Sequence, residues 1–319
     1  MISMTTNSPF LSPLSQSFRM KNLHLEHPED TILNGDLSVL DWFEHKAFWS
    51  VKIDGAPAIV WGKCPATGEF FVGTKSVFNK VKIKINYTHE DIERNHEGQV
   101  ADILHVALEC LPSTDNIYQG DFIGFGGDNV YQPNTITYVF DEVITEHFII
   151  APHTQYHIDE EMEELCLRNT IATPLLFDLD DTEKCKFVKP KVFTMEEDDI
   201  ANVCWFARQM STLCKFVDDK KAALIKKDIN SCIRFGLPIK DDDFDCDPNL
   251  IRFWKLIKSI KEDLLFMCEN DGPRAYIKLK EIDAEGYVRA NGKGYYKLVN
   301  REVFSYANFN NGKFQRVTS

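Results

Sequence analysis

The chain has 319 residues, of which 44% are hydrophobic, enough for one large domain or one domain with a substantial insertion. Its formal net charge of −13 argues against indiscriminate coating of nucleic acid, because phosphate binding depends on lysine and arginine. A nucleic-acid substrate therefore requires a local basic groove. The nine cysteines never occur as Cys-x-x-Cys, which predicts free thiols in a reducing compartment.

The N-terminal segment, residues 1–17, is rich in Ser, Thr and Pro and predicts a flexible tail without the features of a leader peptide. No apolar run approaches the length that crosses a bilayer, so we expect a soluble, cytoplasmic protein. A short helix is predicted over residues 37–45.

Residues 50–62 form the most informative stretch, which is Ser-Val-Lys-Ile-Asp-Gly-Ala-Pro-Ala-Ile-Val-Trp-Gly. Alternation along a strand places Lys52 and Asp54 on one face and apolar residues on the other. The Gly-Ala-Pro turn is expected to bring residues 58–61 back as a neighbouring strand. A lysine that is partly desolvated at a strand end can lose its proton and act as a nucleophile.

A strand is predicted over residues 70–74, directly before Lys75, and helical spacing of apolar residues predicts a helix over residues 90–111. Between them, alternating lysines predict a basic stripe on one strand face: Lys80, Lys82 and Lys84. This stripe is the best local candidate for contact with a phosphate backbone.

Two further strands carry candidate site residues. The strand over residues 117–124 contains Asp121 after a glycine, either as a site carboxylate or as an aspartate that caps a turn. The strand over residues 135–142 places Tyr138 and Phe140 on one face, as site rings or as core aromatics.

The pattern changes to helical spacing over residues 159–269, which predicts a helical insertion. Its strongest helices are expected over residues 196–216, 220–235 and 248–268. Lysines at three-residue steps in the last helix predict a basic face that binds a nucleic-acid strand, with an ordinary solvated surface as the alternative: Lys255, Lys258 and Lys261. Strands return after residue 274, and a turn at Asn291-Gly292 is expected to pair the strands that carry Glu285 and Lys297.

Five short motifs occur in a fixed order: Lys52-Ile53-Asp54-Gly55, Gly120-Asp121, the strand with Tyr138 and Phe140, Glu285-Gly286-Tyr287-Val288, and Tyr296-Lys297-Leu298. Together they resemble the motifs of the covalent nucleotidyltransferases, the superfamily of DNA ligases, RNA ligases and mRNA capping enzymes. The resemblance implies an α+β nucleotidyltransferase (adenylation) domain of antiparallel sheets, formed by residues 18–158 and 270–319 around the helical insertion. About twenty residues follow Val299, so we expect no C-terminal oligonucleotide-binding barrel, which favours the build of phage RNA ligases.

The resemblance implies that Lys52 attacks the α-phosphorus of ATP, and that the AMP then passes to a 5′-phosphate end to which a 3′-hydroxyl is joined. The implied nucleotide-binding residues are Asp54, Lys75, Asp121, Tyr138, Phe140 and Lys297. The implied metal ligands are Glu285 and Asp121, for Mg²⁺ or alternatively Mn²⁺, since carboxylate and phosphate oxygens suit a hard ion. RNA is favoured over DNA as the nucleic-acid partner.

Two departures from the family pattern leave an alternative open. Val299 stands where RNA ligases usually carry a second lysine, and Pro57 where many ligases and capping enzymes have arginine. The alternative is a catalytically degenerate ligase fold that binds nucleotide or nucleic-acid ends.

The N-terminal half also resembles a group of uncharacterised proteins carried by large tailed bacteriophages. This resemblance lies in residues 23–35, 50–62 and 70–80. It implies a phage-encoded protein in the host cytoplasm and supplies no function.

Overall fold

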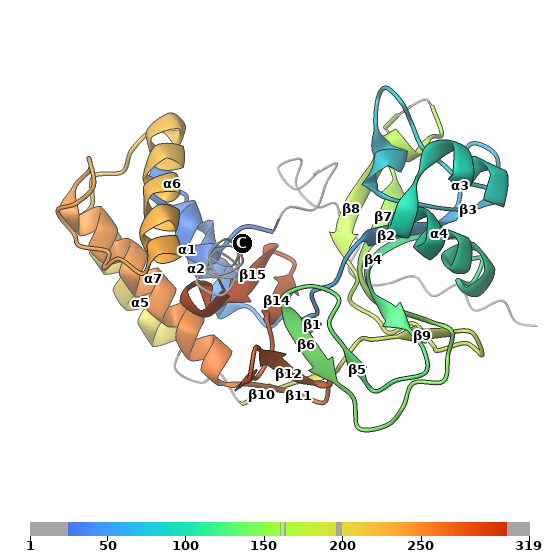
Figure 1. Ribbon diagram of the computed structural model, residues 1–319. Coiled ribbons are helices and arrows are strands. Elements are labelled where there is room, and N and C mark those ends of the chain that lie inside the picture. The colour runs from blue at the N-terminus through green and yellow to red at the C-terminus, as the bar shows by residue number, and fades with distance from the viewer. Residues whose placement is uncertain (1–24, 160, 163, 196–199, 305–319) are drawn as a thin grey trace, which may run out of the picture.

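The computed structural model describes residues 25–159, 161–162, 164–195 and 200–304. The tail predicted over residues 1–17 lies outside this part of the chain. The described fold is α+β, as expected, with mostly antiparallel sheets. It forms a sheet-rich lobe and a helix-rich lobe (Figure 1).

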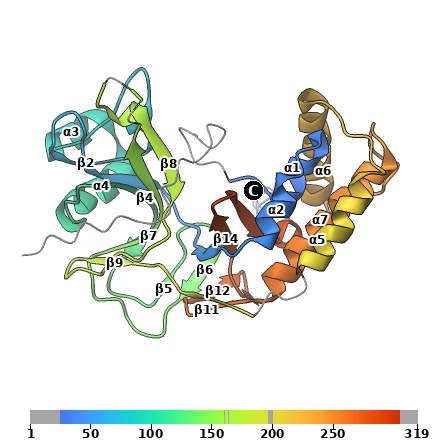
Figure 2. The ribbon, with the colours of Figure 1, turned by 180° about the vertical axis from the view of Figure 1, so that it is seen from behind.

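A six-stranded sheet in the order β3-β2-β4-β7-β8 forms the sheet-rich lobe, with β9 paired to β7 in parallel and the other pairs antiparallel. Its strands are β2 (Ala58–Lys63), β3 (Phe70–Gly73), β4 (Ile117–Phe125), β7 (Phe148–Ile158), β8 (Thr170–Pro174) and β9 (Cys185–Phe187). Helices α3 (His89–Asn95) and α4 (Gly98–Cys110) lie beside it (Figure 2), and the apolar side of α4 packs on the sheet. Two short 3₁₀ helices, η3 (Lys75–Phe78) and η4 (Leu167–Asn169), contact each other.

A single helix was predicted over residues 90–111, but the structure has two helices there, α3 and α4. Thr88 and Asp91 form a capping box that begins α3, and the backbone becomes extended at His96 and Glu97. Gly98 then starts α4 with a φ of +59°, a conformation that favours glycine.

A three-stranded antiparallel sheet in the order β1-β14-β15 lies between the two lobes (Figure 1). Its strands are β1 (Phe48–Lys52), β14 (Gly286–Asn291) and β15 (Gly294–Val299). The registered residues Trp49, Arg289 and Tyr296 share the face that packs on the helices, and Lys52 and Lys297 share the opposite face. The predicted pairing of the strands around Glu285 and Lys297 is confirmed.

The prediction that β1 and β2 are neighbours is wrong, since β1 pairs with β14 and β2 joins the six-stranded sheet. The segment between them crosses from one sheet to the other because its main chain bonds to β4. Ala56 N donates to Phe122 O at 3.1 Å, and Phe122 N donates to Pro57 O at 3.0 Å.

Two smaller sheets join segments from the middle of the chain to segments that follow α7, a four-stranded sheet in the order β13-β12-β6-β5 and the pair β10-β11. Their strands are β5 (Val130–Tyr131), β6 (Ile136–Val139), β10 (Val192–Thr194), β11 (Cys268–Asn270), β12 (Arg274–Ile277) and β13 (Lys280–Ile282). Through these pairs, strands that precede and follow the helices share sheets.

The helix-rich lobe has one apolar core that includes Trp42, Trp254 and Leu298 of β15. Its helices are α1 (Pro28–Thr31), η2 (Ile32–Asn34), α2 (Ser38–Glu44), α5 (Ile200–Ser211), α6 (Asp219–Phe235) and α7 (Pro248–Phe266). Asp218 and Asp247 cap the N-termini of α6 and α7. The three long helices lie close to the predicted ranges, although residues 196–199, in the first of those ranges, lie outside the described part of the chain.

The predicted helical insertion, residues 159–269, is too long at its start, and the lobe also recruits α1 and α2 from the N-terminal region. Strands β8 and β9 belong to the six-stranded sheet, where both pair with β7. Each has five residues or fewer, so its own sequence pattern is weak and pairing with a distant strand decides its conformation.

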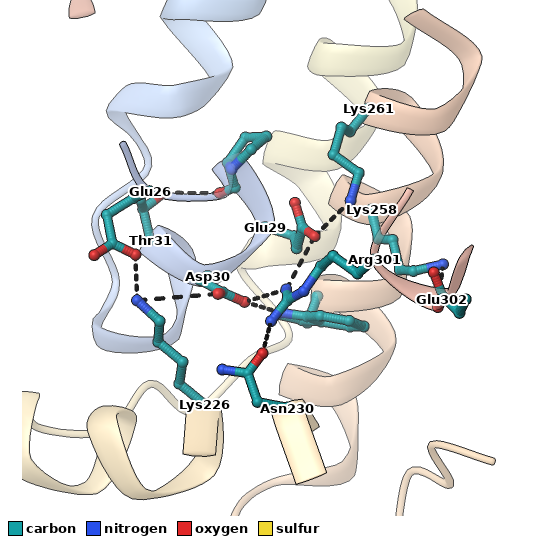
Figure 3. Close-up of polar contacts among 12 residues, drawn as sticks. Glu26, Glu29, Asp30, Thr31, Lys226, Asn230, Lys258, Lys261, Arg301 and Glu302 are labelled. Atoms are coloured by element: carbon teal, nitrogen blue, oxygen red, sulfur yellow. Dashed lines mark hydrogen bonds and ion pairs between the residues drawn. The ribbon is translucent and has the colours of Figure 1, made fainter. Parts of the chain in front are cut away.

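A buried ion network joins α1 to α7 and to Arg301 (Figure 3). Glu29 accepts hydrogen bonds from Lys261 Nζ at 2.6 Å and from Arg301 at 3.1 Å, and both Glu29 and Lys261 are 0% exposed. Asp30 accepts from Arg301 at 2.9 Å and from the Trp254 indole at 3.1 Å. The N-terminal helix is thus held in the lobe by charges as well as by apolar packing.

All nine cysteines are free thiols, as predicted. Among the helices of the described ranges, none combines the length and apolar character that a bilayer crossing requires.

Candidate active site

Lys52 lies at the end of β1, where its Nζ donates a hydrogen bond to Glu285 Oε2 at 2.5 Å. Strand register sets this contact, because Lys52 lies opposite Gly286 and Glu285 directly precedes that residue. A side chain at Gly286 would place its Cβ 2.3 Å from Leu298 O, so the close approach of β14 to β15 requires glycine.

A pocket of about 220 Å³ opens beside Lys52, between the three-stranded and six-stranded sheets. One wall comes from β1, β14 and β15, and the other from β4, β7 and the segments that end β8 and follow β9. Four predicted site residues from four separate elements line it: Lys52, Lys75, Asp121 and Lys297. The tertiary structure therefore gathers residues that are far apart in the sequence.

The proton on Lys52 is held more tightly than the sequence led us to expect. Burial lowers the pKa of its amine, but the carboxylate of Glu285, followed by Asp54 and Asp121, outweighs burial and raises the pKa above its ordinary value. Desolvation alone therefore does not free the amine for nucleophilic attack. Its proton must be transferred first.

Three carboxylates share this one ammonium group. Burial raises the pKa of Glu285 and of Asp54, repulsion from Asp121 adds to the effect, and the attraction of Lys52 only partly opposes it. The immediate surroundings of Lys52 thus contain three carboxylates, although the pocket as a whole is lined by four lysines.

Lys297 is a second lysine on the pocket wall formed by β1, β14 and β15. Burial lowers the pKa of its amine, and the nearby cations Lys52, Arg301 and Lys226 lower it further, against the attraction of Glu26. A bound anion between these cations would relieve their repulsion.

The structure does not bring the other predicted nucleotide-binding residues, Asp54, Tyr138 and Phe140, to the lining of this pocket. Tyr138 is 1% exposed and its hydroxyl accepts a hydrogen bond from Asp54 N at 2.8 Å, so its ring is not available to stack on a base. Phe140 is half-buried and packs edge-on against Tyr131. Asp54 accepts a hydrogen bond from Asn134 at 2.8 Å. Tyr138 therefore positions the lysine segment from behind.

Gly55 allows this segment to pass close to β4. A Cβ at this position would lie 2.5 Å from Phe122 O, so we expect Gly55→Ala to lower the free energy of unfolding by roughly 1–3 kcal/mol in urea denaturation. Gly292→Ala is the matched control, since nothing lies within 4 Å of a Cβ there. Equal stability of the two variants would show that the lysine segment can move away from β4.

The predicted metal ligands, Asp121 and Glu285, both act on Lys52, but they do not form a metal site by themselves. Within the described ranges, no group of three or more His, Cys, Asp or Glu side chains is arranged to hold a metal ion. Mg²⁺ commonly binds through one or two carboxylates together with substrate phosphates. Two carboxylates, too few to hold the ion by themselves, fit an ion that arrives with the phosphates of a nucleotide.

The two lysine patterns predicted to contact nucleic acid are not basic surfaces of the expected kind. Residues 81–85 form no strand, and Lys82 has a φ of +55°, so its neighbours Lys80 and Lys84 share no strand face. The α7 lysines are neutralised by carboxylates: Lys255 by Asp241, Lys258 by Glu262 and Glu302, and Lys261 by Glu29. Helical spacing located the helix, but Lys261 is 0% exposed and does not belong to a surface face, and the spacing could not show the acids packed against these lysines.

Several polar residues of the pocket were not predicted as site residues, among them His153, Gln119 and Lys189. His153 lies at an irregularity in the pairing of β4 with β7, and its Nε2 is 3.5 Å from Asp121 Oδ1. Gln119 and Lys189 also line the pocket. Lys189, two residues after the short strand β9, was not singled out because a helical insertion was predicted for this region.

The fold and this pocket define an α+β protein with a lysine-rich pocket between two sheets. The chain belongs to the Family of unknown function (DUF6267), whose model matches residues 22–247 and 239–313. No curated protein and no solved structure matches it.

Proposed function

We propose that the protein is an ATP-dependent nucleotidyltransferase that forms a lysyl-AMP intermediate at Lys52 and joins RNA ends as an RNA ligase. The observation that carries the proposal is the convergence of Lys52, Lys75, Asp121 and Lys297 on one pocket, with Glu285 hydrogen-bonded to Lys52. The nucleotidyltransferase class of the fold and a location in the host cytoplasm belong to the same proposal.

The proposed first step begins with proton transfer from the Lys52 ammonium. Glu285 already accepts a hydrogen bond from this group, and its raised pKa makes it a better base than an ordinary carboxylate. The Nζ lone pair then forms a bond to the α-phosphorus, the bond to the bridging oxygen breaks, pyrophosphate leaves with that electron pair, and one of the two remaining Nζ protons passes to solvent. Lys297 lies on the same face of the sheet and stabilises the charge on the phosphoryl oxygens.

The residues that would hold Mg²⁺ or Mn²⁺ are Glu285 and Asp121, jointly with the phosphates of ATP. When bound, such an ion would supply positive charge to the phosphoryl oxygens. RNA is the nucleic acid of the proposal, with a 5′-phosphate end as acceptor of AMP.

The test is incubation with ATP that is labelled at the α-phosphate, with Mg²⁺, followed by denaturing electrophoresis. We expect label that stays with the protein, is lost on omission of the metal and is absent with labelled GTP. A protein that binds ATP but never acquires label would contradict the covalent step.

The contact between Glu285 and Lys52 predicts a specific response to Glu285→Gln. We expect the pKa of Lys52 to fall, because the largest charge that raises it is removed, and labelling to drop about 100-fold or more. Asp121→Glu is the comparison, expected to keep activity because the carboxylate is retained. The measurements are labelling rates and NMR titration of isotopically methylated lysines, and an unchanged Lys52 titration in Glu285→Gln would contradict the assignment.

The same ion pair predicts a pH dependence of stability. Because the folded pKa of Lys52 lies above its ordinary value, the stabilisation is complete below that ordinary value and is lost as the pH rises through the folded one. The difference in stability between wild type and Glu285→Gln should therefore shrink at strongly alkaline pH.

A second function is favoured by one observation, the hydrogen bond that keeps Lys52 protonated. In this alternative the protein binds nucleotide or nucleic-acid ends in the same pocket and performs no covalent step. Binding of ATP by calorimetry together with an absence of label would support it.

A further inference from the structure

Lys189 lies across the pocket from Lys52, on the wall formed by the six-stranded sheet and its connections. Its Nζ donates hydrogen bonds to Leu175 O and Phe177 O, both at 2.6 Å, in the segment that follows β8. An ammonium group has three N–H donors, so these two contacts fix its position and leave a third for an acceptor in the pocket.

A neutral hydrogen-bond donor could also join the segments that follow β8 and β9, so the charge of Lys189 is not required for this structural contact. Burial lowers the pKa of Lys189 to about 8 against the attraction of Asp178, so the cation is kept at a cost in free energy. A half-buried cation that is fixed by neutral carbonyls is well suited to receive an anion.

The cations of the pocket are divided between its two walls. Lys52 and Lys297 extend from the three-stranded sheet, whereas Lys189 and Lys75 extend from the other side. A ligand that satisfies both walls must carry negative charge on more than one group. The volume of about 220 Å³ is below the ~300–1,000 Å³ of pockets that enclose a whole ligand, which suits a chain of phosphates.

We infer that Lys189 binds the terminal phosphates of a nucleoside triphosphate, and thereby the pyrophosphate group that leaves, opposite Lys297. This inference rests on the proposed function for the identity of the ligand. It assigns Lys189 the discrimination between triphosphate and monophosphate, a role that the five sequence motifs do not assign.

The test is calorimetric binding of three probes in the presence of Mg²⁺: α,β-methylene-ATP, inorganic pyrophosphate and AMP. We expect Lys189→Met to weaken the first two by about tenfold or more, as for loss of a charged hydrogen bond, and to leave AMP nearly unchanged. Lys191→Met is the matched control, since this lysine lies two residues away and is exposed. Lys189→Arg should restore most of the affinity.

Equal weakening of AMP and of the triphosphate analogue would overturn the inference, and so would unchanged binding of all three probes. Should Lys189→Met fail to fold, acetylation of the wild type followed by mass spectrometry decides the question. Pyrophosphate should protect Lys189 and not Lys191, and equal acetylation of Lys189 with and without pyrophosphate would contradict the inference.

The two proposals can fail separately. Triphosphate binding that depends on Lys189, without covalent label from ATP, would overturn the proposed transferase and leave this inference standing. Covalent label from ATP together with triphosphate binding that is independent of Lys189 would support the proposed transferase and overturn this inference.

Discussion

We expect Lys52→Ala to acquire no detectable label from ATP. Of the four lysines that line the pocket, Lys52 is the one that ends β1 and donates a hydrogen bond to a carboxylate with a raised pKa. Without its nitrogen the phosphoamide bond cannot form, because no other group has the same position. The measurement is the labelling gel, read beside a thermal melt that reports the fold.

Lys63→Ala is the matched control for this variant. Lys63 also ends a strand and also pairs with a carboxylate, Asp115 at 2.6 Å, but it lies outside the pocket lining. It should be labelled as strongly as the wild type. Persistent label on a folded Lys52→Ala protein would mean that another residue carries the nucleotide.

The largest effect on stability is expected from Lys261→Met. Without Lys261, the buried carboxylate of Glu29 keeps Arg301 as its ion-pair partner, and Arg301 also pairs with Asp30 (Figure 3). Loss of one partner from a buried ion pair costs roughly 3–5 kcal/mol, because the remaining charge stays out of water. Urea denaturation should therefore show a large decrease in the free energy of unfolding.

Lys255→Met provides the comparison on the same helix. Its partner is Asp241, and its side chain is 41% exposed, so water replaces the lost contact and stability should change little. Similar stabilities of the two variants would show that the network around Glu29 is unimportant for folding.

Elements whose pattern is local could be predicted from the sequence. Apolar spacing located α6 and α7, and the Asn291-Gly292 turn paired β14 with β15. Local pattern sufficed in these places because the nearest residues determine the conformation.

Which strands are neighbours and which charges meet depended on contacts between residues far apart in the sequence. The pattern of residues 50–62 predicts a hairpin, but Ala56 and Pro57 form main-chain hydrogen bonds with β4. As a result, β2 pairs with β4 in another sheet and not with β1. Tyr138 lies in a strand as predicted, but its ring is buried and does not line the pocket. The pKa of Lys52 is raised, whereas the sequence led us to expect an amine that loses its proton easily. The carboxylate responsible, Glu285, lies 233 residues away along the chain, and electrostatic attraction depends on distance in space.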